Sequence, residues 1–167
     1  MTLLKTSELS LFADYFQFYL QDEKAAGING DSWTEEATDR MLAIETGAIG
    51  VGTVRNVDVA VIIEQHDVAP DLSEAADQIV ECSIEVYSGK LIAAGCTDYL
   101  PDAQRIAILP GIYRARITYE NLSSVSDDGL DGDDRYRIQI WPAPKENLKI
   151  IKRRETGRGG ELNEQFG

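Results

Sequence analysis

The sequence is poor in cysteine and histidine and has no long apolar run, and each shortage excludes a class of protein. Its 167 residues contain two cysteines, Cys82 and Cys96, and one histidine, too few for a disulfide-rich scaffold or a four-thiolate zinc site. No run approaches the roughly 18 apolar residues of a membrane-spanning helix, and the N-terminal residues lack the pattern of a secretion signal. We therefore expect a cytoplasmic protein that needs no cofactor, no metal and no membrane.

Basic residues are also scarce, because 16 of them stand against 29 acidic residues and give a net charge of -13. Such a surface repels DNA and RNA and gains nothing from counterion release, so direct nucleic-acid binding is not expected. The same charge attracts a basic protein over long distances. A domain of this size buries about 68–70% of the surface of its unfolded chain, which is enough for one hydrophobic core.

Alternation of apolar and polar residues is the main structural signal, and it is typical of strands with one buried face. In the first such segment, Phe16, Phe18 and Leu20 are expected to face the core. Turns at Ser88-Gly89 and Pro110-Gly111 predict two hairpins. The expected strands are residues 16–21, 48–53, 57–65, 80–87, 91–94, 105–109, 113–119 and 136–141. The sequence therefore predicts a mainly β fold, an antiparallel β-sandwich of about eight strands.

One helix is expected beside these strands. Ser32 and Glu35 stand three residues apart, as in a capping box. Trp33, Ala37 and Met41 follow at helical spacing. These features predict one short helix near residues 33–44.

Charge divides the chain into a domain and an extension. Residues 1–144 hold 10 bases and 25 acids, whereas residues 145–167 hold 6 bases and 4 acids. We expect a single acidic domain over residues 1–153 and a Gly-rich C-terminal extension over 154–167. This basic tail is predicted to dock on an acidic body, either its own or that of a second copy in a homo-oligomer.

The candidate partner-binding site is an acid-rich segment, residues 127–134, here called the acidic loop. An EF-hand register fails, since Gly132 at position 6 puts Gly129 at position 3 and Ile138 at position 12. A looser calcium site, a solvated turn and an electronegative patch for a basic partner all stay open. The candidate residues are Asp127, Asp128, Asp131, Asp133 and Asp134.

A groove for a small molecule or glycan is the alternative function, because aromatic side chains with a polar tip favour binding sites. Its candidate residues are Trp33, Arg55, Tyr136 and Trp141. An enzyme is not expected. No nucleophile elbow, phosphate loop or H-E-x-x-H helix is present, and any imidazole chemistry would depend on His66 alone. No catalytic residue is therefore predicted.

Four patches of the first third of the chain resemble the ComJ family, also called Nin. They are residues 8–18, residues 33–37, residues 47–49 and the pair Arg55-Asn56, in matching order and approximate spacing. The resemblance covers roughly residues 7–65. Members of this family inhibit a DNA-entry nuclease by direct association. The resemblance therefore implies a shared fold and a non-enzymatic protein-binding role, with a basic protein such as a nuclease as the partner.

Overall fold

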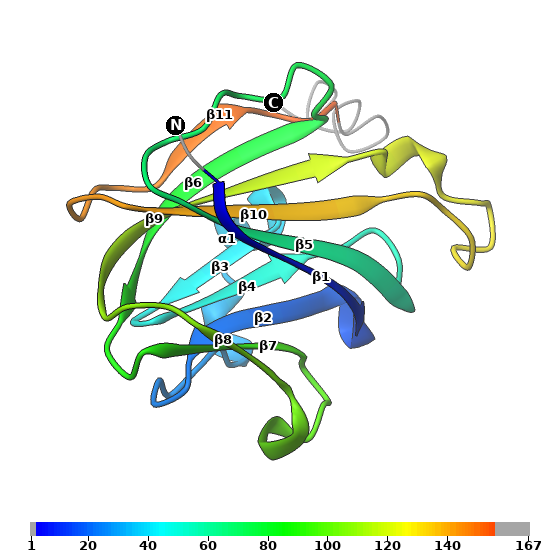
Figure 1. Ribbon diagram of the computed structural model, residues 1–167. Helices are drawn as coiled ribbons and strands as arrows, with labels where there is room; N and C mark the ends of the chain where they lie inside the picture. Colours follow the sequence, from blue (N-terminus) through cyan, green and yellow to red (C-terminus); the bar gives the residue numbers. More distant parts are fainter. Residues whose placement is uncertain (1–2, 156–167) are drawn as a thin grey trace.

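Two β-sheets pack face to face in the computed structural model, which describes residues 3–155 (Figure 1). The first sheet contains, in order across it, β1 (Leu3–Phe12), β5 (Asp58–His66), β10 (Arg135–Pro142), β9 (Gly111–Glu120), β6 (Gln78–Val86) and β11 (Lys149–Lys152). The second contains β3 (Leu42–Glu45), β4 (Ala48–Gly52), β2 (Gln17–Asp22), β7 (Lys90–Gly95) and β8 (Gln104–Ala107). The predicted β-sandwich is confirmed.

The sandwich differs from the expected one in strand number and in several pairings. The two predicted hairpins are wrong, because the turns at Ser88-Gly89 and Pro110-Gly111 carry the chain from one sheet to the other: β6 and β9 belong to the first sheet, β7 and β8 to the second. The described residues form eleven strands, and β1, β3 and β11 had no counterpart in the sequence prediction. Strands β1 and β11 lie at the two edges of the first sheet, and nearly all of their residues are exposed or half-buried. Their sequences therefore show little alternation of apolar and polar residues. The second and third strands of the first sheet, β5 and β10, run parallel, although every other pair is antiparallel within residues 3–155.

The helix lies where it was predicted but is shorter. Helix α1 (Glu35–Arg40) begins after Thr34, whose hydroxyl accepts a hydrogen bond from the Ala37 amide at 3.1 Å. The predicted cap, Ser32, belongs instead to a preceding 3-10 turn (Gly30–Ser32). Met41 adopts a left-handed conformation with φ of 59° and ends the helix. Leu42 then begins β3, because pairing with β4 buries it completely.

The prediction that Phe16 faces the core is wrong. Tyr15 and Phe16 both have positive φ, 57° and 60°, which breaks the extended backbone before β2 begins. Phe16 is 52% exposed, whereas Phe18 and Leu20 are fully buried as expected. The alternation therefore holds only from Gln17 onward.

Three aromatic rings join the two sheets in the core. The ring of Tyr136 on β10 meets Phe18 of β2 and Tyr119 of β9 edge to face, with both centroid distances 5.9 Å. The Tyr119 hydroxyl also donates to the Met41 carbonyl at 2.5 Å. Since edge-to-face pairs add stabilisation beyond burial alone, these rings fix how the sheets are stacked.

The start of the basic tail lies on the body of the same chain. Arg153 pairs with Asp39 of α1 at 2.9 Å, and Arg154 donates to the Asp39 carbonyl and to Gln78, both at 2.7 Å. The rest of the predicted extension, residues 156–167, lies outside the described residues, and the division at residue 153 stays a prediction. None of the described helices has the length and apolarity needed to cross a membrane.

Asp22 at the end of β2 connects the second sheet to the turn between β6 and β7. It is fully buried, and its carboxylate accepts from the amides of Lys24, Tyr87 and Ser88 at 2.8–2.9 Å. Burial alone would raise the pKa of Asp22, but these amide donors lower it below its ordinary value.

We expect Asp22→Asn to lower the free energy of unfolding near neutral pH by about 1–3 kcal/mol, since an amide nitrogen would face buried donors. A lowered pKa gives stability above the ordinary carboxyl range that is lost as pH falls through the lowered value. Urea denaturation at a series of pH values from 7 downward should thus show that the free energy of unfolding falls less steeply with pH for this variant than for the parent. Asp58→Asn, at an exposed position, is the control. An equal pH dependence of the free energy of unfolding for Asp22→Asn and the parent would contradict the lowered pKa of Asp22.

Candidate functional site

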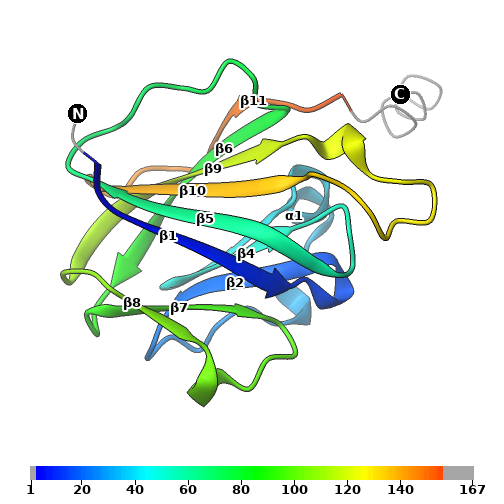
Figure 2. The same ribbon diagram turned by 45° about the vertical axis from the view of Figure 1, so that its right-hand side comes forward.

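The acidic loop lies at one end of the sandwich. It follows a 3-10 turn (Leu122–Ser124) and projects beyond the sheets at the end where β1 finishes and β2 begins (Figures 1 and 2). Four of its carboxylates are exposed, those of Asp127, Asp128, Asp131 and Asp133. No ion pair found among residues 3–155 uses any of these four. The loop therefore presents net negative charge to solvent.

Internal hydrogen bonds order this loop. Gly129, with φ of 75°, closes a turn by donating its amide to the Ser126 carbonyl at 2.9 Å. The Asp128 carboxylate accepts from the Ser126 hydroxyl at 2.6 Å and from the Leu130 amide at 3.0 Å. These two donors, the serine hydroxyl most, lower the pKa of Asp128 below its ordinary value.

The fifth predicted residue, Asp134, has a different role because it is buried. It pairs with Arg55 at 2.5 Å and accepts from the Tyr136 hydroxyl at 2.7 Å. That hydroxyl in turn accepts the Val54 amide at 2.9 Å, and Arg55 donates to the Leu130 carbonyl at 3.2 Å. Asp134 thus attaches the loop to the core and offers no charge to a partner.

The four predicted groove residues do not share one groove. Tyr136 is in the core and Arg55 is bound to Asp134. Trp141 lies on the outer face of the first sheet, beneath the guanidinium of Arg116 at 4.9 Å from the ring centroid. Trp33 lies just before α1 and lines a groove that none of the other three lines. Of the four residues predicted to form a groove for a small molecule or glycan, only Trp33 therefore stays a candidate.

Trp33 lines a different groove, of about 440 Å³, at the same end of the molecule as the acidic loop. Sequence analysis missed its exposed members Tyr15 and Phe16, since a strand pattern places aromatics inside. Its wall also includes Gly30, Thr38, Met41, Gly52 and Thr53. The Trp33 indole is fixed by donating to Gln17 at 2.8 Å, and Thr53 bonds the Arg55 carbonyl at 2.8 Å. This last contact connects the groove to the residues that anchor the loop.

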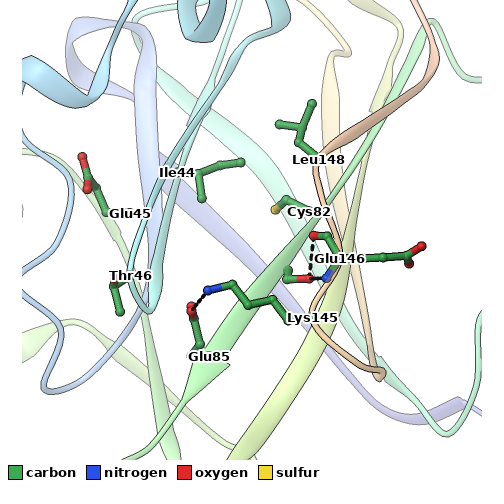
Figure 3. A pocket seen from close by; sticks show the side chains of 9 residues that line it. Ile44, Glu45, Thr46, Cys82, Glu85, Lys145, Glu146 and Leu148 are labelled. Carbon is green, nitrogen blue, oxygen red and sulfur yellow. Dashed lines mark hydrogen bonds and ion pairs between the residues drawn. The ribbon is translucent and has the colours of Figure 1, made fainter.

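A second pocket, of about 310 Å³, opens between β3 and β6 and offers little chemistry. Figure 3 shows Cys82 near Ile44 and Leu148, with Lys145 reaching toward Glu85. The Lys145 ammonium lies 3.3 Å from the Glu85 carboxylate. Burial raises the pKa of the Cys82 thiol to about 12, so it stays protonated and is a poor nucleophile.

Charged side chains on the outer face of the first sheet are mostly paired with one another. Glu81 of β6 bonds Arg114 at 3.3 Å and Arg116 at 2.9 Å, and Glu64 of β5 bonds Arg137 of β10. His66 is buried and directs its Nε2 at Glu64, 2.8 Å away. Within residues 3–155 no three His, Cys, Asp or Glu side chains are placed to hold a metal ion together. The ion pairs neutralise much of the acid on this face.

Two solved structures are similar to this one. ComJ from Bacillus subtilis, an inhibitor of the DNA-degrading activity of NucA, aligns with a TM-score of 0.65 over 85% of this chain and 98% of its own, at 19% identity. A protein described as crocagin biosynthetic gene J aligns with a TM-score of 0.58 over 86% of this chain and 100% of its own, at 16% identity. No family model and no curated protein sequence matches the chain. The predicted resemblance to the ComJ family is confirmed at the level of the fold.

We expect Arg55→Met to cost about 3–5 kcal/mol of folding stability, because it leaves the Asp134 carboxylate buried without its ion-pair partner. The matched control is Arg135→Met, whose side chain is 46% exposed and lies 3.8 Å from Glu120. That change should cost less than about 1 kcal/mol. Urea denaturation measures both, and similar losses for the two variants would contradict the anchoring role of Arg55.

Proposed function

We propose that this chain is a non-enzymatic protein-binding domain that inhibits a nuclease by covering its basic DNA-binding surface. The observation that carries the proposal is the ordered acidic loop, whose four exposed carboxylates take part in no ion pair within residues 3–155. The fold similarity to ComJ, which inhibits NucA, supports the same class of partner. The partner-binding residues proposed are Asp127, Asp128, Asp131 and Asp133.

Electrostatics explains why such a loop suits a nuclease. An enzyme that grips DNA gathers cationic side chains around the phosphates. An anionic protein is drawn to that surface by long-range attraction, which raises association rates at low salt. The phosphate-binding cations of the nuclease and the carboxylates of the loop are then mutually neutralised, and DNA is excluded from the same surface.

The order of the loop adds to this argument. Ser126 holds it from both sides, because its hydroxyl donates to Asp128 and accepts from the Asp131 amide at 3.0 Å. Ser124 likewise accepts the Asp133 amide at 2.7 Å. A loop that is already ordered loses little conformational entropy on binding. Its charges are therefore available at a fixed geometry.

The test is an assay of DNA degradation by purified NucA, with the full chain as inhibitor. We expect inhibition by the parent, and an increase of about tenfold or more in the half-inhibitory concentration at about 50 mM salt for the variant D127N/D128N/D131N/D133N. The difference should shrink at about 300 mM salt, where exposed charges are screened.

The matched control neutralises four exposed carboxylates away from the loop, in the variant E8Q/D71N/E74Q/E146Q. It changes net charge by the same amount, so any loss that it shares with the loop variant is due to net charge alone. No inhibition by the parent would refute the proposed function. Equal half-inhibitory concentrations for the two variants would show that the acidic loop has no specific role in the inhibition.

A further inference from the structure

The connection between β1 and β2 holds two large aromatic side chains in a conformation that such residues rarely adopt. Tyr15 and Phe16 both lie in the left-handed region, with φ of 57° and 60°. Their side chains are 70% and 52% exposed. Residues 13–16 are called here the aromatic corner. A bulky residue at positive φ costs free energy, and such strain is found where a function depends on it.

Main-chain contacts hold the aromatic corner in place. The Ala13 amide donates to the Val57 carbonyl at 3.0 Å, and the Phe16 amide donates to the Ala13 carbonyl at 3.0 Å. The Phe16 carbonyl accepts from the Thr53 amide at 2.9 Å. Glycine could make every one of these contacts without strain. The two rings are thus not needed for the turn, although the chain presents them to solvent.

Tyr15 and Phe16 both line the 440 Å³ groove together with Trp33. Met41, which is 7% exposed, also lines it. The hydrogen bond from Trp33 to Gln17 keeps the indole in position. The groove therefore offers a preformed aromatic surface, of the kind that dominates binding energy at protein interfaces.

Acidic residues lie next to the residues that line this groove. Asp14 precedes Tyr15, and its carboxylate accepts from the Tyr15 amide at 3.1 Å and the Thr97 hydroxyl at 3.0 Å. Exposed Glu35 lies one helical turn before the lining residue Thr38 on α1. The acidic loop is connected to the same end through Arg55. An apolar groove with an anionic border is complementary to a basic surface whose long side chains have apolar stems.

We propose that Tyr15, Phe16 and Trp33 are the affinity anchors for the basic surface of the nuclease, while the acidic loop steers the encounter. The proposal rests on the proposed function and assigns the two parts of one interface different kinetic roles. Anchors desolvated at the centre of an interface mainly determine the dissociation rate. Charges at its rim mainly determine the association rate and its salt dependence.

The experiment measures association and dissociation rates between immobilised NucA and the full chain at several salt concentrations. For Y15S/F16S we expect the dissociation rate to rise by about tenfold or more, with the association rate and its salt dependence unchanged. For D127N/D128N/D131N/D133N we expect a slower association with a weaker salt dependence. Leu109→Ser is the control, because Leu109 is 80% exposed in the turn between β8 and β9.

The rate measurements distinguish the ways in which the proposal can be wrong. Binding of Y15S/F16S at parent rates would overturn the anchor role and leave the proposed function intact. No binding by the parent would refute the proposed function, and the anchor role with it. Light scattering after size exclusion tests a third outcome, in which the parent is a dimer and Y15S/F16S is a monomer. The aromatic residues would then bind a second copy of this chain and not the nuclease, which would also overturn the proposal.

Thermal unfolding separates an anchor from a structural residue without any partner. Tyr15→Gly removes the ring and relieves the positive φ, so the melting temperature should stay the same or rise. A clear fall in melting temperature would show that the ring stabilises the fold, which would overturn its assignment to a partner.

Discussion

The hydroxyl of Tyr136 connects the centre of the core to the loops at the candidate interface. Its ring packs against Phe18 and Tyr119, and its oxygen accepts from Val54 and donates to Asp134. Burial, and then the hydrogen bond to Asp134, raise the pKa of this phenol far above its ordinary value, so the proton stays in place. Asp134 in turn holds Arg55, which reaches Leu130. The core therefore anchors the acidic loop through Asp134, while the loop's own hydrogen bonds order the rest of it.

The sequence predicted the parts of the fold in which burial alternates along a strand, as in β6 and β10. It did not reveal that β5 and β10 run parallel, because a strand buried on one face shows the same alternation with either neighbour orientation. The length of α1 was overestimated since Met41 and Leu42 fit helical spacing. Only the pairing of Leu42 with Val51 across β3 and β4 shows why the helix ends.

The candidate site was predicted in part, and the omissions have physical causes. Within the acidic loop, position decides which carboxylate is buried. Asp134 is two residues before Tyr136, so the period of two residues along a strand places both on the inner face. The prediction of the acidic loop counted acidic residues and did not use this period. The exposure of Tyr15 and Phe16 had no such signal, because positive φ at two bulky residues follows from contacts with Thr53 and Val57, distant in sequence.

The parallel pair of β5 and β10 in the first sheet bears on how the chain reaches this structure. Four other strands lie between β5 and β10 in the sequence, and the register joins Ala60 to Arg135. Hairpins of strands adjacent in sequence, such as β3 with β4 and β7 with β8, can form early, but the β5–β10 pair must wait for a large loop to close. High contact order of this kind is associated with folding in milliseconds to seconds. During synthesis on the ribosome, β1 and β5 therefore emerge long before the strand that completes their sheet.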